Sequence, residues 1–104
     1  MADKQYLILL DVDARKRHRH RTEGGRITEF IVQLEIRTET GWKEVVRFDC
    51  AHNYAHKDCL DISGRQKKMS LYLDYEDALT LADDDINENW MTYRERFLKG
   101  VFPC

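Results

Sequence analysis

The apolar residues of this chain repeat with one period in its middle and with another near its C-terminus. Between positions 27 and 37, apolar side chains at every second residue from Phe30 to Ile36 alternate with mostly polar ones, which is typical of a half-buried strand. Between positions 75 and 97 the apolar residues are three or four positions apart, which predicts one amphipathic helix. The two periods together predict a fold of the α+β class.

The predicted helix carries suitable residues at both of its ends. Asp74 can cap the N-terminus, and Glu76 and Asp77 lie where the helix dipole is positive. Lys99 and Gly100 suit the C-terminal end. One long C-terminal helix is therefore expected between Asp74 and Gly100.

Three further segments have the character of strands. Residues 42–50 alternate in the same way and follow a turn cluster, so they form an antiparallel hairpin with the strand before them. The basic segment 14–21 precedes a glycine pair, which predicts a second hairpin, and a short strand is expected around residues 67–73. Residues 51–65 are expected to form a structured loop, and residues 6–10 either add an edge strand or pack across the sheet. The predicted architecture is an antiparallel β-meander of about four strands packed by the helix.

The register of the basic hairpin follows from its charges. A two-residue loop would turn the arginines toward the core, where unpaired charge is costly. A three-residue loop, residues 24–26, instead places Arg21 opposite Glu29 and Arg15 opposite Glu35 on the polar face. We therefore predict the second register, with a bulge at the glycines and with the histidines of this strand over the apolar face.

The net charge of −2 conceals a strong separation of charge. Residues 15–21 carry only basic charges, and residues 74–88 carry only acidic ones. One interpretation is a positive face that binds the phosphates of RNA or DNA. The other is a charged strand, which could be an edge strand protected from aggregation by its basic residues. The candidate nucleic-acid-binding residues are Arg15, Arg17, Arg19 and Arg21.

The bulk properties of the chain indicate one domain that does not enter a membrane. A length of 104 residues fits a single domain, residues 1–104. The longest apolar run is too short to cross a bilayer, and no signal peptide is expected. Three cysteines without a C-x-x-C motif favour reduced thiols over a disulfide framework or a zinc knuckle. We therefore expect a cytoplasmic protein.

Polar residues gather where the strand at 42–50 ends and the following loop begins, a position that often carries function. Arg47, Asp49, His52 and His56 are the candidate catalytic residues. His52 and His56 could act as general acid and base on a ribose 2′-hydroxyl, with Arg47 stabilising phosphate charge.

Two other interpretations of the same stretch stay open. Histidines four positions apart also suit two ligands of a metal ion on a helical turn, with Asp49 or Asp58 as the third ligand. Alternatively, the group is structural. Because this spacing alone is weakly specific, no metal ligand is assigned and no cofactor is named.

Three motifs resemble a small family of uncharacterised prokaryotic domains: "GGR-x2-EF-x-VQLE", "W-x-EVVRFD-x-AH-x2-AH-x-D" and "ALT-x-A-x2-DI-x2-NW-x2-YRERF". The match runs from about Arg15 to Leu98. The basic strand, "VVRFD" and the histidine pair also resemble the TumE-like toxins of toxin–antitoxin systems. That second resemblance implies an RNA-directed, toxin-like activity with RNA or an antitoxin-like protein as partner. It carries over the same four catalytic candidates.

Two functions are therefore expected from the sequence. The first is an RNA-directed domain that uses the arginine-rich hairpin for phosphate and the Arg/Asp/His group for chemistry. The alternative is a non-catalytic protein-interaction or dimerisation module, with a homodimer formed through the open face of the sheet.

Overall fold

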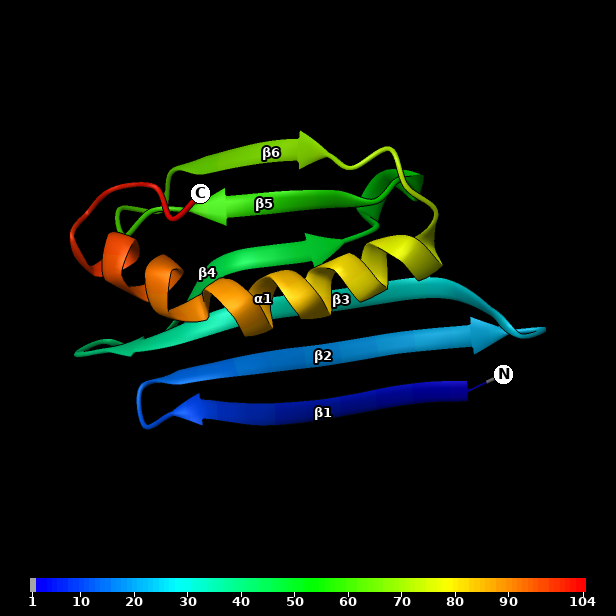
Figure 1. Ribbon diagram of the computed structural model, residues 1–104, viewed down its shortest axis with the longest axis horizontal. Coiled ribbons are helices and arrows are strands. Elements are labelled where there is room, and N and C mark those ends of the chain that lie inside the picture. The colour runs from blue at the N-terminus through cyan, green and yellow to red at the C-terminus, as the bar shows by residue number, and fades with distance from the viewer. Residues whose placement is uncertain (1) are drawn as a thin grey trace.

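Six strands form one antiparallel sheet in the computed structural model, which describes residues 2–104 (Figure 1). Each strand lies beside its neighbours in the chain, which is the order of a β-meander. The turn η1 (Ala51–Asn53) follows the fourth strand, and the helix α1 (Tyr75–Leu98) follows the last. The strands are β1 (Ala2–Asp11), β2 (Ala14–Glu23), β3 (Arg26–Thr38), β4 (Gly41–Asp49), β5 (His56–Leu60) and β6 (Gln66–Ser70).

The predicted α+β class, the meander and the C-terminal helix are confirmed, but the sheet has six strands rather than about four. The apolar run 6–10 belongs to β1, which is an edge strand, so the basic strand β2 lies inside the sheet and is not an edge. The expected loop 51–65 contains β5. Its sequence, His-Lys-Asp-Cys-Leu, places polar residues on both faces and therefore lacks the apolar alternation from which strands are predicted.

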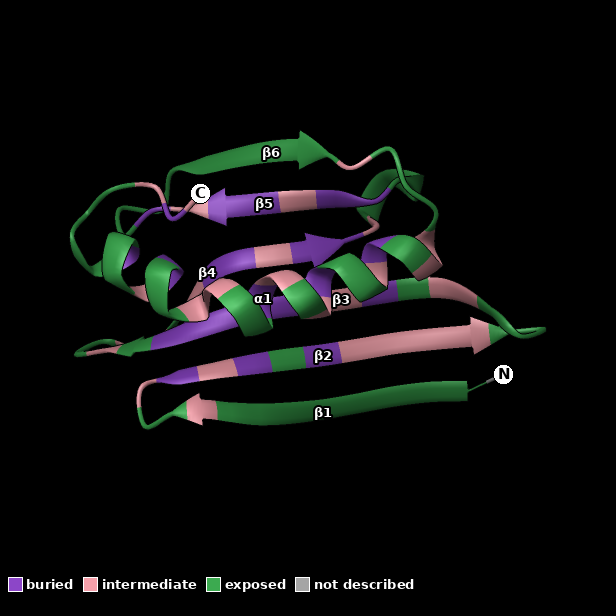
Figure 2. Cartoon of the chain, viewed as in Figure 1, coloured by how far each residue is buried: buried purple, intermediate pink, exposed green. Residues whose placement is uncertain are grey.

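The helix α1 packs on the face formed by β2, β3 and β4 (Figure 1). The side chain of Asp74 caps the helix by accepting a hydrogen bond from the Asp77 backbone N–H at 2.8 Å. In Figure 2 the central strands are largely buried beneath α1, whereas β1 and β6 are exposed. Within residues 2–104, no helix combines the length and the apolar character needed to cross a membrane. The helix contributes Ala78, Ala82, Ile86, Tyr93 and Phe97 to the core.

The register of β2 against β3 is the predicted one through the body of the hairpin. Arg21 lies opposite Glu29 and Arg15 lies opposite Glu35. The loop is different, because the glycine pair forms a two-residue turn and the bulge lies beside it, between Arg21 and Thr22. Both glycines have a positive φ, 58° and 79°, which glycine adopts without steric cost.

A disulfide joins Cys59 of β5 to Cys104, with their Cα atoms 6.1 Å apart. The expectation of three reduced thiols is therefore wrong, and Cys50 is the free cysteine of the described residues. The two partners are 45 positions apart in sequence, and only the fold returns the C-terminus to β5 (Figure 1). The spacing of the cysteines could not show this.

Candidate functional site

The face of the sheet opposite α1 has no second layer over it in residues 2–104 (Figure 1). We call it the open face. Polar side chains from the inner strands lie there, yet several of them are buried, which is unusual for groups that could be solvated. The buried polar residues of the open face are Gln33, Glu35, Asp49, His56 and Asp58.

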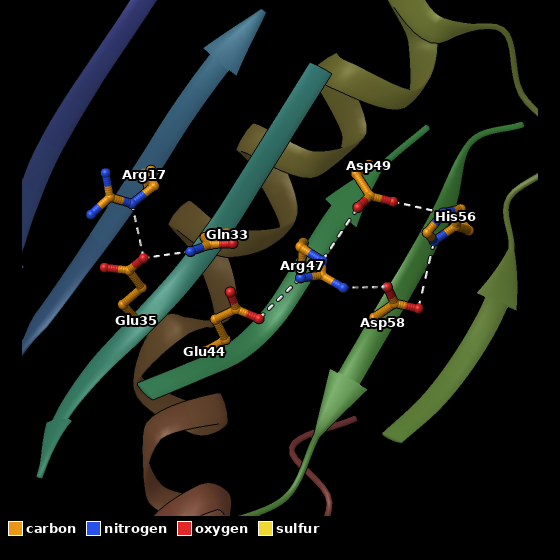
Figure 3. A network of polar contacts seen from close by, with 8 residues as sticks. All are labelled: Arg17, Gln33, Glu35, Glu44, Arg47, Asp49, His56 and Asp58. Carbon is orange, nitrogen blue, oxygen red and sulfur yellow. Dashed lines mark hydrogen bonds and ion pairs between the residues drawn. The ribbon is translucent and has the colours of Figure 1, made fainter. Parts of the chain in front are cut away.

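Three of these side chains, together with the partly buried Arg47, form what we call the Asp–His cluster: Arg47, Asp49, His56 and Asp58 (Figure 3). The β4–β5 register brings them together, because Arg47 lies opposite Asp58 and Asp49 lies opposite His56. His56 Nε2 lies 2.6 Å from Asp49 Oδ1, and His56 Nδ1 lies 3.5 Å from Asp58 Oδ1. The imidazole therefore lies between two carboxylates.

The guanidinium of Arg47 contacts the other oxygen of each aspartate. Arg47 Nε lies 3.3 Å from Asp49 Oδ2, and Arg47 Nη2 lies 3.3 Å from Asp58 Oδ2. A third carboxylate, that of Glu44, lies 3.1 Å from Arg47 Nη1. His56 and Asp58 are each 1% exposed, so these pairings compensate charges that would otherwise be costly to bury.

The structure brings together three of the four predicted catalytic residues. Arg47, Asp49 and His56 are in the cluster, whereas His52 lies on the exposed turn η1 with a φ of 66°. The predicted pairing of His52 with His56 on a helical turn is wrong, because the chain forms a tight turn at the first and a strand at the second. Asp58, expected only as a third metal ligand, is a full member. The sequence feature that could have indicated its membership is its position two residues after His56, because side chains two residues apart in a strand lie on the same face.

The predicted nucleic-acid-binding arginines fall into two pairs. Arg15 Nε and Arg17 Nε lie 2.5 Å and 2.9 Å from the two carboxylate oxygens of Glu35. Burial alone would raise the pKa of Glu35, but hydrogen bonds from Arg17, Gln33 and Arg15 hold this pKa below its usual value. This first pair is therefore engaged within the protein, and Figure 3 shows the contact of Arg17 with Glu35.

Arg19 and Arg21 form the second pair and are less completely engaged. Their Nη2 atoms lie 3.1 Å and 3.9 Å from Asp3 Oδ2. The Nε atom of each is buried and has no hydrogen-bond acceptor. Both residues line a pocket of about 250 Å³, together with Asp49 and Cys50. The pocket thus combines two guanidinium groups that have unused donors with one carboxylate from the Asp–His cluster.

The histidines of β2 lie on the opposite face, as predicted. His18 is buried between Tyr6, whose ring stacks on it at 4.4 Å, and His20, whose Nδ1 lies 2.7 Å from His18 Nε2. Burial is the main cause that lowers the pKa of His18. Asp83 of α1 lies 3.4 Å from His18 Nδ1 and 3.1 Å from Lys16 Nζ. These contacts attach α1 to β2 and are separate from the open face.

The fold and the site define a small α+β protein with an open polar sheet face and a buried Arg–Asp–His cluster. A family model described as a domain of unknown function (DUF7718) matches residues 1–103, and the chain belongs to this family. No curated protein and no solved structure matches the chain. The resemblance to TumE-like toxins and the prokaryotic origin find no support in these comparisons and stay predictions.

Proposed function

We propose that the protein is an RNA-directed domain that binds backbone phosphate in the pocket lined by Arg19 and Arg21. The observation that carries this proposal is the pair of buried Nε donors without acceptors. A guanidinium group presents its N–H donors in a fork that matches phosphate oxygens, and a buried donor without a partner destabilises the empty state. An anionic ligand would pair with these two guanidinium groups, whose side chains are 39% and 36% exposed.

The other two arginines have a weaker role in this proposal. Arg15 and Arg17 share the carboxylate of Glu35, so the three side chains together carry one positive charge. This positive charge attracts a polyanion that lies beside the pocket, whereas Arg19 and Arg21 make the direct contacts with it. Of the four nucleic-acid-binding arginines predicted from the sequence, only Arg19 and Arg21, which have unused donors, are therefore proposed to contact phosphate directly.

The same pocket supports a toxin-like cleavage of RNA with altered roles for the predicted residues. Asp49 lines the pocket, whereas His56 is buried behind it. Asp49 would therefore accept the proton of a ribose 2′-hydroxyl. The deprotonated oxygen would attack the adjacent phosphorus, and the 5′-oxygen would leave with a proton from water. His56 is then a positioning residue, and so is Arg47, because its guanidinium is bound to three carboxylates.

Replacing both Arg19 and Arg21 with alanine is expected to weaken binding to a fluorescent single-stranded RNA at least tenfold at about 100 mM salt. The slope of log K against log salt concentration should become shallower by about one unit per arginine, because fewer counterions are released on binding when a phosphate contact is lost. Fluorescence anisotropy measures both quantities. The matched control is Arg26→Ala, which removes an exposed arginine that pairs with Glu76 outside the pocket. Equal weakening by the control, or no saturable binding by the wild type, contradicts the proposal.

One observation favours the alternative, a dimerisation module. β1 is an edge strand of ten residues whose outer backbone groups have no partner strand in the described residues. Leu7 and Leu9 on the open face are exposed, and so is Ile8 on the other face. A long, apolar edge strand is a template for pairing with another strand. A second copy could pair its β1 in antiparallel orientation around a twofold axis and continue the sheet.

Leu9→Lys is expected to convert such a dimer to a monomer in analytical ultracentrifugation, because Leu9 is 71% exposed and lies beside the free edge. The matched control is Val12→Lys, which adds the same charge to an exposed residue in the turn after β1. A wild-type protein that is monomeric at about 100 μM rules out this second function.

A further inference from the structure

The Asp–His cluster places three metal-ligating groups together in a buried position. One donor atom from each of Asp49, His56 and Asp58 lies within 4.8 Å of the other two. We propose that these three side chains bind one divalent transition-metal ion, with Zn²⁺ and Mn²⁺ as the candidates. The proposed site does not require RNA, although one of its ligands, Asp49, also lines the pocket proposed to bind RNA.

Buried polar atoms without aligned partners are the first argument for an ion. Both ring nitrogens of His56 are buried and have no hydrogen bond of acceptable geometry, and the same holds for Asp49 Oδ1 and Asp58 Oδ1. The 2.6 Å approach of His56 Nε2 to Asp49 Oδ1 is thus a close contact without an aligned hydrogen bond. Such atoms are uncommon in folded proteins and cost stability, and a cation among them would bind one donor atom of each of the three residues.

The position of Arg47 is the second argument. Its guanidinium contacts Oδ2 of Asp49 and Oδ2 of Asp58, both at 3.3 Å. The Oδ1 atoms of both aspartates are left beside the imidazole of His56 (Figure 3). Outer partners that orient ligating carboxylates in this way are usual around bound metals. Arg47 is therefore an orienting residue of the proposed site.

The balance of charge is the third argument. Arg47 carries one positive charge and contacts three carboxylates, those of Glu44, Asp49 and Asp58. Apart from His56, the group therefore carries two excess negative charges. A divalent cation bound between these carboxylates would offset both charges.

The donor set favours a borderline metal over Mg²⁺ or Ca²⁺. Two carboxylate oxygens and one imidazole nitrogen suit Zn²⁺ or Mn²⁺, while Mg²⁺ prefers oxygen ligands and water. Bonds of about 2.1 Å separate neighbouring donor atoms by about 3–3.5 Å, and the three donor atoms here lie within 4.8 Å of one another. The paired strands β4 and β5 hold the backbone of all three ligands in register.

The test uses the wild-type protein after removal of metals with EDTA. Titration with Zn²⁺, Mn²⁺ and Mg²⁺ in a calorimeter should give one equivalent of Zn²⁺ or Mn²⁺ binding and no comparable Mg²⁺ binding. In the NMR spectrum of the histidine rings, Zn²⁺ should shift His56 and leave His18, His20 and His52 unchanged. This readout requires no variant and no activity. The absence of stoichiometric binding, or shifts confined to the other histidines, overturns the proposal.

Two variants locate the ion, and a third serves as the control. His56→Gln and Asp49→Asn should each weaken Zn²⁺ binding at least a hundredfold, whereas His52→Gln, on the exposed turn η1, should keep it. Circular dichroism shows whether each variant is folded. Unchanged affinity in a folded His56→Gln protein overturns the site. Loss of RNA binding in the variant without Arg19 and Arg21, with intact Zn²⁺ binding, is the result expected if both proposals hold. Zn²⁺ binding without any RNA binding by the wild type contradicts only the proposed RNA function, and RNA binding without Zn²⁺ binding contradicts only the metal site.

Discussion

Asp58→Ala is expected to lower the free energy of unfolding by about 3–5 kcal/mol in metal-free buffer. Asp58 is 1% exposed and lies 3.3 Å from Arg47 Nη2. Removing this carboxylate leaves Arg47 Nη2 without its hydrogen-bond acceptor and opens a cavity at a buried position, and this loss exceeds the energy of a surface pair several-fold.

Urea denaturation followed by circular dichroism measures this effect. The control is Asp84→Ala, which removes an exposed carboxylate from α1 and should change stability by less than about 0.5 kcal/mol. Asp58→Asn keeps the volume but not the charge, so a loss close to that of alanine assigns the effect to charge. A loss below about 1 kcal/mol for Asp58→Ala would show that the cluster does not depend on this carboxylate.

Phe97→Ala is expected to cost about 3–5 kcal/mol, because a buried aromatic ring is replaced by a cavity at the end of α1. Phe97 is 1% exposed in the core. The first eight residues of α1 contribute only small fully buried side chains, Ala78 and Ala82, whereas the larger ones, Ile86, Tyr93 and Phe97, follow toward its C-terminal end. Loss of this ring should therefore weaken the docking of the whole helix.

The adjacent residue provides the control for this prediction. Leu98→Ala removes an apolar side chain of similar size from an exposed position of the same helical turn and should change stability by less than about 0.5 kcal/mol. Thermal and urea denaturation compare the two variants. Equal losses for Phe97→Ala and Leu98→Ala would mean that the C-terminal end of α1 does not pack against the core.

The elements that sequence predicted well are those that bury one side only. The alternation from Phe30 to Ile36 and the apolar stripe of α1 both report one buried face, and opposite charges in β2 and β3 specify the register. β1 was ambiguous because its apolar run has no polar face. The sequence does not predict β5, because its Lys57 occupies a position that apolar residues hold in the other strands. Asp85 of α1 pairs with Lys57 at 3.3 Å, and this contact between distant residues cannot be inferred from a local pattern.

The candidate site was predictable to the extent that it follows the chain. Arg47 and Asp49 lie two residues apart at a strand end, so their shared face could be inferred. The inclusion of Asp58 and the exclusion of His52 depend on the pairing of β4 with β5, which the sequence did not indicate. Which arginines have unused donors depends likewise on Glu35, because this one carboxylate binds Arg15 and Arg17 together.

The order of the elements also has a consequence for synthesis of the chain. Every strand pairs with the next one along the chain, so each pairing closes only a short loop at small entropic cost. The helix that covers the apolar face comes after all six strands. On the ribosome, the strands can therefore pair before their cover exists, and the nascent sheet exposes its apolar face until α1 has emerged. A chaperone that binds extended apolar surface would act in this interval.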